Sequence, residues 1–139
     1  MISTKGRYAI RLMIDLVEQA TANETPSPTP LDDIALRQGI SKKYLESIVK
    51  MLVTGKLVKG TSGKGGGYML TRAPEDYNVY EVLRLTEGSM STVACLEEDA
   101  QECPREKACK TVAMWRRYDE LVKDYFSKIT IINLANGKI

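Results

Sequence analysis

The chain has 139 residues, of which 43% are hydrophobic and 27% charged, and this size and composition are typical of one globular domain with an appendage. Its apolar runs are shorter than the roughly 20 residues of a membrane span, and its N-terminal stretch MISTKGRYAI is too polar for a signal peptide, so we expect a cytoplasmic protein without a membrane partner. Its net charge is +2. With no histidine and no paired acids on a recognisable scaffold, it offers few groups for general acid–base catalysis, and we expect neither an enzyme nor a small-molecule substrate.

The first predicted element is an amphipathic helix from Ser3 to about Ala20. Its apolar residues recur at helical spacing and form one stripe for burial: Tyr8, Ala9, Leu12, Met13, Leu16 and Val17. Three prolines within residues 23–30 then predict a loop. A second helix is expected to follow at once, with Thr29 as its cap, Pro30 in its first position and Asp32 completing a capping box.

Two short helices are predicted to meet at a tight turn. Gly39 ends the second helix, and Ser41 is placed to cap a third that runs to Gly55. The spacing of the small and apolar residues is typical of a helix-turn-helix: Ile34, Ala35, Gly39, Ile40, Leu45 and Ile48. For these two helices alone, an αα-hairpin without a DNA role is the alternative.

A hairpin is predicted directly after the third helix. Its strands are Leu57–Lys59 and Tyr68–Leu70, and a glycine-rich loop, Gly60–Gly67, joins them. A hairpin in this position is a wing, so the expected fold is mostly α, a winged helix-turn-helix with a small β-hairpin. The loop is not a nucleotide-binding loop, because Lys64 is followed by Gly65 where a Walker A motif requires Ser or Thr.

The positive charge of the chain lies in this winged half. Residues 1–74 hold 11 lysines and arginines against 6 acidic residues, and within residues 41–72 seven cations face the single acid Glu46. A solvated charged face is the alternative reading of such a cluster. Together with a winged helix-turn-helix, however, the basic segment predicts binding to double-stranded DNA.

In such a fold the third helix lies in the major groove, and its N-terminal residues point outward: Ser41, Lys42, Lys43, Tyr44, Glu46 and Ser47. We expect the two lysines to contact phosphates and Glu46 to accept a hydrogen bond from a cytosine amino group. Lys5 and Arg7, at the start of the first helix, are expected to hold the DNA backbone.

The second half of the chain is predicted to carry a dimer interface. Asn78 is placed to cap a helix that ends at Gly88 and packs against the wing, and a polar, acidic stretch follows as far as Pro104. A long helix then begins near Arg105, with an apolar stripe of Ala108, Val112, Trp115, Tyr118, Val122, Tyr125 and Ile129. The simplest partner is the same helix of a second subunit, which gives a homodimer through Val112, Trp115, Tyr118, Val122 and Tyr125. Packing onto its own domain is the alternative.

The predicted organisation has three parts. Residues 1–74 form the DNA-binding domain, residues 75–104 a linking helix and a cysteine-bearing loop, and residues 105–139 the dimerisation helix and C-terminal segment. A dimer is expected to occupy two half-sites separated by about 34 Å, one turn of DNA, or a multiple of it.

Four motifs resemble one known family. They are S-T-K-G-R-Y-A at 3–9, G-I-S-x-x-Y-L-E at 39–46, G-G-G-Y at 65–68 and a three-cysteine loop before A-x-W. They cover nearly the whole chain and resemble the Rrf2 family of bacterial transcriptional regulators, in particular its IscR-like branch of iron–sulfur cluster regulators. The resemblance implies a repressor-type homodimer on a DNA operator.

In that branch three cysteines bind a 2Fe-2S cluster, and the resemblance assigns this role to Cys95, Cys103 and Cys109. The gaps between them hold seven and five residues where the branch has five in each, and Val112 stands where the branch has a histidine as fourth ligand. An acidic side chain, the Thr111 hydroxyl or solvent is left as the fourth donor. Zinc, three metal-free thiols and a thiol switch of Cys95 with Cys103 are the alternatives.

The resemblance also bears on the DNA-binding residues. It implies that Glu46 makes the choice of DNA depend on cluster occupancy, and it aligns Ser62 with an arginine that enters the minor groove. Lys64, two residues later, is expected to substitute for that arginine. Alternative functions are a repressor of cysteine metabolism, a nitric oxide sensor and, from another class, an iron–sulfur electron carrier or scaffold.

Overall fold

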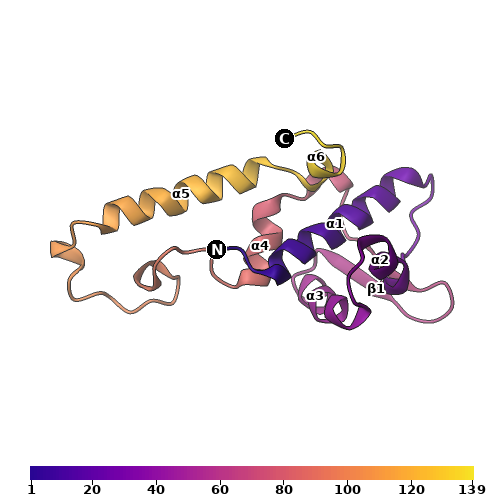
Figure 1. Ribbon diagram of the computed structural model, residues 1–139, viewed down its shortest axis with the longest axis horizontal. Helices are drawn as coiled ribbons and strands as arrows, with labels where there is room; N and C mark the ends of the chain where they lie inside the picture. The colour runs from indigo at the N-terminus through magenta and orange to yellow at the C-terminus, as the bar shows by residue number, and fades with distance from the viewer.

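The computed structural model describes residues 1–139, and its N-terminal half folds as three helices followed by a hairpin (Figure 1). The elements are α1 (Thr4–Ala22), α2 (Leu31–Gln38), α3 (Lys42–Thr54), β1 (Val58–Thr61) and β2 (Gly67–Leu70). The two strands are antiparallel, with Val58 opposite Leu70 and Thr61 opposite Gly67. This order of elements is the predicted winged helix-turn-helix within a mostly helical chain.

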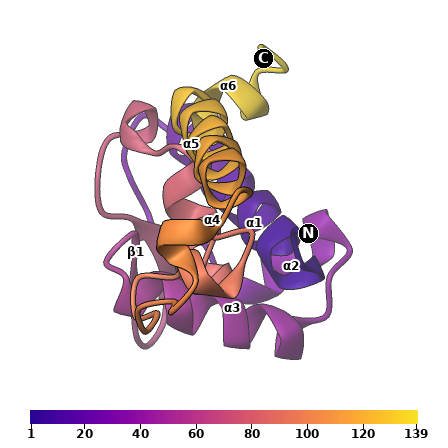
Figure 2. The ribbon, with the colours of Figure 1, turned by 90° about the vertical axis from the view of Figure 1, so that its left-hand side faces the viewer.

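The C-terminal half consists of α4 (Val79–Glu87), α5 (Val112–Lys128) and α6 (Ile131–Ala135), with 3₁₀ turns at Pro74–Asp76, Ala94–Leu96 and Glu106–Ala108. In Figure 1, α5 is an arm that extends away from the winged domain, and the segment between α4 and α5 lies along it. Figure 2 views α5 nearly end-on, above α4, with which it is in contact. None of the helices combines the length and the hydropathy that a membrane span requires.

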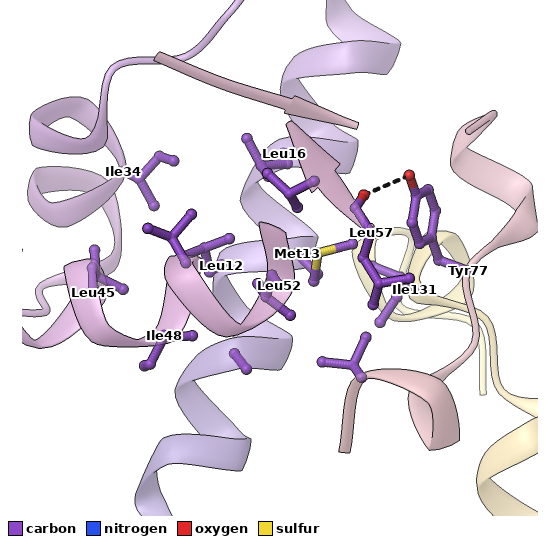
Figure 3. Close-up of a cluster of buried hydrophobic side chains, with 14 of the residues drawn as sticks. Leu12, Met13, Leu16, Ile34, Leu45, Ile48, Leu52, Leu57, Tyr77 and Ile131 are labelled. Atoms are coloured by element: carbon purple, nitrogen blue, oxygen red, sulfur yellow. Dashed lines mark hydrogen bonds between the residues drawn. The ribbon is translucent and has the colours of Figure 1, made fainter. Parts of the chain in front are cut away.

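One hydrophobic core holds the winged half together (Figure 3). Of its 19 buried residues, 18 lie between Ala9 and Leu83, and the other is Ile131 of α6. Ile131 therefore fixes the end of the chain to the core, where α6 packs on α1. No residue of α5 is buried, because this helix contacts the rest of the molecule mainly through α4.

A charged side chain within this core joins α1 to α2. Asp15 of α1 is buried, and its Oδ1 accepts a hydrogen bond from Arg37 Nη2 at 2.8 Å. Its Oδ2 accepts from Arg37 Nε at 3.0 Å and from Gln38 Nε2 at 3.1 Å. These hydrogen bonds raise the pKa of the Arg37 guanidinium, which stays cationic. The pair holds the last turn of α2 just before the turn at Gly39.

The start of α2 differs from the prediction. Pro30 rather than Thr29 is the N-cap residue, it makes no side-chain capping bond, and Leu31 occupies the first helical position. Thr29 instead pairs with Tyr68 of the wing, each backbone amide donating to the other's carbonyl at 2.8 Å. The predicted capping box was wrong because this long-range backbone pairing places Thr29 beside the wing.

The helix capped by Asn78 forms as predicted, but it packs on α1 and α3 rather than on the wing. Two glycines permit the close approach. A Cβ atom at Gly6 would lie 2.2 Å from Glu87 Oε1, and one at Gly55 would lie 2.3 Å from Leu85 Cδ1. The apolar face of α4 thus finds its partners in helices that precede it, which local sequence patterns do not reveal.

The last long helix is shorter than predicted. α5 begins at Val112 instead of near Arg105, and Ala108, predicted on its stripe, lies in a 3₁₀ turn. This turn folds back on α5, where Arg116 pairs with Glu106. The polar segment before Val112 has few apolar residues to bury, so packing does not support an extension of the helix.

Candidate nucleic-acid interface and cysteine loop

The exposed face of α3 carries most of the predicted DNA-reading residues. Ser41 caps the helix, its Oγ accepting from the Tyr44 amide at 3.2 Å, and Gly39 makes the preceding turn with a φ of 62°. One side of α3 is buried through Leu45, Ile48, Val49 and Leu52. The other side is exposed and includes Ser41, Lys42, Lys43, Glu46 and Ser47. Burial of the apolar side therefore presents these five residues together.

Tyr44 and Lys42 of the predicted set contact side chains of α1 and α2. Tyr44 is half-buried, and its ring packs edge-to-face on Tyr8 of α1 with 5.6 Å between the ring centroids. Lys42 Nζ lies 2.9 Å from Asp32 Oδ2, and this hydrogen bond raises the pKa of the lysine. Both groups of the ion pair are exposed, so it contributes little stability and leaves the ammonium accessible to a phosphate.

The N-terminus of α1 is already occupied by a carboxylate. Glu87 Oε1, at the end of α4, accepts from the Ser3 amide at 3.1 Å and from Ser3 Oγ at 2.7 Å. Lys5 is half-buried, and Arg7 is exposed with Nη2 donating to Thr4 Oγ1 at 3.2 Å. Any DNA backbone contact here rests on the two cations rather than on the free amides of α1. No local sequence pattern indicates this capping contact, because it joins residues 84 positions apart.

The wing presents a basic tip, and the strand that follows this tip is held against the start of α2. Ser62 and Lys64 are exposed at the tip, where Gly63 and Gly65 adopt positive φ angles of 85° and 76°. At Gly67, where β2 begins, a Cβ atom would lie 2.3 Å from the carbonyl oxygen of Thr29, so only glycine fits there. The G-G-G-Y run was the one sequence signal of this close backbone approach.

The segment between α4 and α5, residues 89–111, is called the cysteine loop below. Cys95 and Cys109 are exposed and Cys103 is partly exposed, and all three thiols are free. The structure places no group of three or more Cys, Asp or Glu side chains where they could hold a metal ion. The predicted ligand set is therefore not assembled in this conformation, and the residues as placed do not fit a 2Fe-2S cluster.

Cys109 is predicted to be the most readily alkylated thiol of the metal-free protein. A hydrogen bond with Thr111, with Sγ 3.4 Å from Oγ1, and the amides at the start of α5 lower the pKa of this thiol. The test compares two chains in which Cys109 is the only cysteine, one with Thr111 and one with Thr111→Val. The pH at which the alkylation rate rises should be lower in the chain that keeps Thr111, because loss of the hydrogen bond disfavours the thiolate. A chain retaining only the exposed Cys95 is the matched control. Identical pH–rate profiles with and without Thr111 would contradict this prediction.

α5 carries an exposed apolar face. Tyr118 and Tyr125, two of the predicted dimer residues, are 53% and 59% exposed, and Leu121 between them is 52% exposed. The other predicted residues, Val112, Trp115 and Val122, are half-buried. An open groove of about 900 Å³ runs beside this face, lined mainly by apolar residues that include Ile2, Met90 and Phe126. An apolar face of this extent is typical of a surface that is covered in the functional molecule.

Comparison with known proteins gives consistent results along the whole chain. The profile of the Rrf2 family, described as "Iron-dependent Transcriptional regulator", matches residues 2–137. The HTH-type transcriptional regulator IscR of Erwinia tasmaniensis is 33% identical over 137 residues, which cover 99% of this chain and 79% of that protein. These relatives are transcriptional regulators, not enzymes.

Two solved structures show the same fold. The structure of CymR, the global cysteine regulator of B. subtilis, superposes with a TM-score of 0.75 at 33% identity and covers 100% of this chain and 98% of that one. IscR of T. potens superposes with a TM-score of 0.72 at 28% identity, and the match covers 99% of this chain and 87% of that one. The similarity thus extends beyond the winged domain to the cysteine loop and α5.

Proposed function

The chain belongs to the Rrf2 family of transcriptional regulators, and we propose that it acts as a homodimer that reads a two-half-site operator in duplex DNA and is regulated through the cysteine loop. The observation that carries the DNA-binding part is the exposed face of α3, beside a basic wing. In that face Lys42 and Lys43 contact phosphates, and Glu46 accepts a hydrogen bond from a base. A single acid among seven cations weakens affinity for phosphate, so its presence favours a role in selecting sequence.

The homodimer is supported by the apolar face of α5. Tyr118, Leu121 and Tyr125 are more than half exposed in the single chain, and they lie on a helix that extends away from the winged domain (Figure 1). Pairing of two such arms covers the apolar groove. It also joins two DNA-binding domains, which are called the reading heads, in one molecule. Two heads match the two half-sites of an operator with two-fold symmetry.

Lys64 of the wing provides a test of the DNA contact. Lys64→Ala should lower affinity for all duplex sequences by a similar factor and reduce the slope of log affinity against log salt by about one unit, because one phosphate contact is lost. Fluorescence anisotropy at four or more salt concentrations measures both quantities. Ser62→Ala removes a neighbouring side chain without a change in charge and is the matched control. If Lys64→Ala leaves the slope unchanged, the wing does not contact phosphate.

The regulatory part of the proposal has two candidate chemistries. The first is a 2Fe-2S cluster on Cys95, Cys103 and Cys109, which the family description and the IscR relatives favour. Its ligation requires the cysteine loop to rearrange, since the three thiols do not converge and no histidine is present. The second is regulation linked to cysteine metabolism without a cluster, which the similarity to CymR and the unassembled ligand set favour.

Two experiments test the proposal. Selection of random duplexes by the full chain, followed by footprinting, should yield an inverted repeat with half-sites about 34 Å apart or a multiple of that distance; absence of any enriched sequence would refute operator reading. Anaerobic reconstitution with iron and sulfide should give stoichiometric loading and a Mössbauer spectrum of a 2Fe-2S cluster, lost on Cys→Ala change at positions 95, 103 or 109. No loading would leave the CymR-like regulator as the function.

A further inference from the structure

Tyr77 is the largest fully buried side chain that the predicted DNA-reading and cysteine sites do not use. It lies between the wing and α4, and its phenolic oxygen makes three hydrogen bonds of 2.9 Å. It accepts from the amides of Thr71 and Arg72 and donates to the carbonyl of Leu57, the bond drawn in Figure 3. One hydroxyl thus uses its single donor and both of its acceptor positions.

The three partners of this hydroxyl lie where the chain enters and leaves the hairpin. Leu57 directly precedes β1, and Thr71 and Arg72 directly follow β2. Leu57 and Thr71 lie one step beyond the pair of Val58 with Leu70, and the Thr71 amide also donates directly to the Leu57 carbonyl at 3.4 Å. The phenol therefore closes the base of the wing, and we call this set of contacts the Tyr77 clasp.

The clasp also holds the link between α3 and the wing. Lys56, the middle residue of the three between α3 and β1, has a φ of 60°, which is unfavourable for a residue with a side chain. Its carbonyl accepts a hydrogen bond of 2.7 Å from Thr71 Oγ1, which itself lies 3.3 Å from the Tyr77 hydroxyl. The link between the recognition helix and the wing is thus held by Thr71, whose amide and hydroxyl both lie within hydrogen-bond distance of the Tyr77 hydroxyl.

The main chain around Tyr77 connects the wing to the far end of α5. The Tyr77 carbonyl accepts from the Ile131 amide, and the Val79 amide donates to the Ile129 carbonyl, both at 2.9 Å. The guanidinium of Arg72 lies over the Tyr77 ring, 4.4 Å from its centroid, and also pairs with Glu81 of α4. The wing base, α4 and the joint between α5 and α6 therefore share one anchor.

From this geometry we infer that Tyr77 is the positioning residue of the wing, and that its hydroxyl sets the orientation in which Lys64 meets DNA. The inference rests on the proposed wing contact. A buried tyrosine with a purely structural role would affect stability alone. A positioning role also changes the number of phosphate contacts, because a wing without its clasp no longer holds Lys64 against the backbone.

Tyr77→Phe keeps the ring and removes the hydroxyl. DNA affinity, measured well below the unfolding temperature, should fall by about three- to tenfold, and the salt slope should decrease by about one unit. Adding Lys64→Ala should then lower affinity less than twofold further, since its contact is already lost. Thr86→Val is the matched control, because it removes a buried hydroxyl that bonds only within α4. An unchanged salt slope together with a full effect of Lys64→Ala would overturn the inference.

A second readout needs no DNA. Hydrogen exchange of the Thr71 and Arg72 amides should accelerate in Tyr77→Phe and stay unchanged in Thr86→Val, and unchanged exchange in both would also overturn the inference. If the wing does not contact DNA, Lys64→Ala has no effect in a chain that keeps Tyr77. This result is distinct from failure of the Tyr77 inference, in which Lys64→Ala keeps its full effect after Tyr77→Phe. If Tyr77→Phe does not fold, Thr71→Val weakens the clasp from its exposed side and should lower the salt slope in the same direction.

Discussion

Leu121→Asp is expected to weaken binding to a two-half-site operator by about 100-fold or more, while affinity for an isolated half-site stays unchanged. In the proposed homodimer, the two DNA-binding domains are linked only through the pairing of α5 with a second copy, and loss of that linkage would remove an avidity gain of about 10²–10⁴. Leu121 is 52% exposed in the single chain, so the aspartate is solvated there and does not unfold the monomer. In the dimer the same carboxylate would be buried without a partner.

The measurement combines analytical ultracentrifugation with anisotropy on full and half operators. Arg117→Ala is the matched control, since it makes the same change in net charge on α5 and removes only an exposed pair with Glu120. The control should remain dimeric and keep its affinity. A Leu121→Asp chain that sediments as a dimer and binds with full affinity would show that the apolar face of α5 is not the dimer interface.

Local chemistry explains which parts of the fold could be predicted from the sequence. Ser41 and Asn78 were placed correctly as helix caps because a cap depends on a side chain and an amide two or three residues later. The turn at Gly39 and the wing between Leu57 and Leu70 follow from equally local signals. The exposed face of α3 can also be predicted, because burial of its apolar residues leaves only one side of the helix accessible to DNA.

Two of the features that could not be predicted depend on residues far apart in the chain, and a third depends on how one loop closes. The residues around Thr29 predict it to be a helix cap, but its backbone pairs with that of Tyr68 in the wing. The contact of Ser3 with Glu87 has no local signature. The family resemblance implies that three cysteines share one ligand set, but their spacing indicates only the length of the loop. The structure places them in no group that could hold a metal ion.

The ion pair of the buried Asp15 with the partly exposed Arg37 leads to the largest expected change in stability. Arg37→Met should lower the free energy of unfolding by about 3–5 kcal/mol, a large share of the roughly 5–15 kcal/mol typical of a domain. The Asp15 side chain is 1% exposed and would keep Gln38 as its only donor, whereas the Arg37 side chain is 38% exposed. Asp15→Leu should therefore destabilise less, because the guanidinium left behind can turn to solvent.

The double variant Asp15→Leu with Arg37→Met separates stability from function. Apolar replacement of both partners should restore most of the lost stability, measured as the urea midpoint at constant m-value. Equal losses in the two single variants would contradict the asymmetry in burial. Because the pair fixes the end of α2 against α1, just before Gly39, the double variant should still bind operator more weakly than the unaltered chain. An operator affinity restored in full would mean that apolar packing alone sets the angle between α2 and α3, and that the ion pair contributes only to stability.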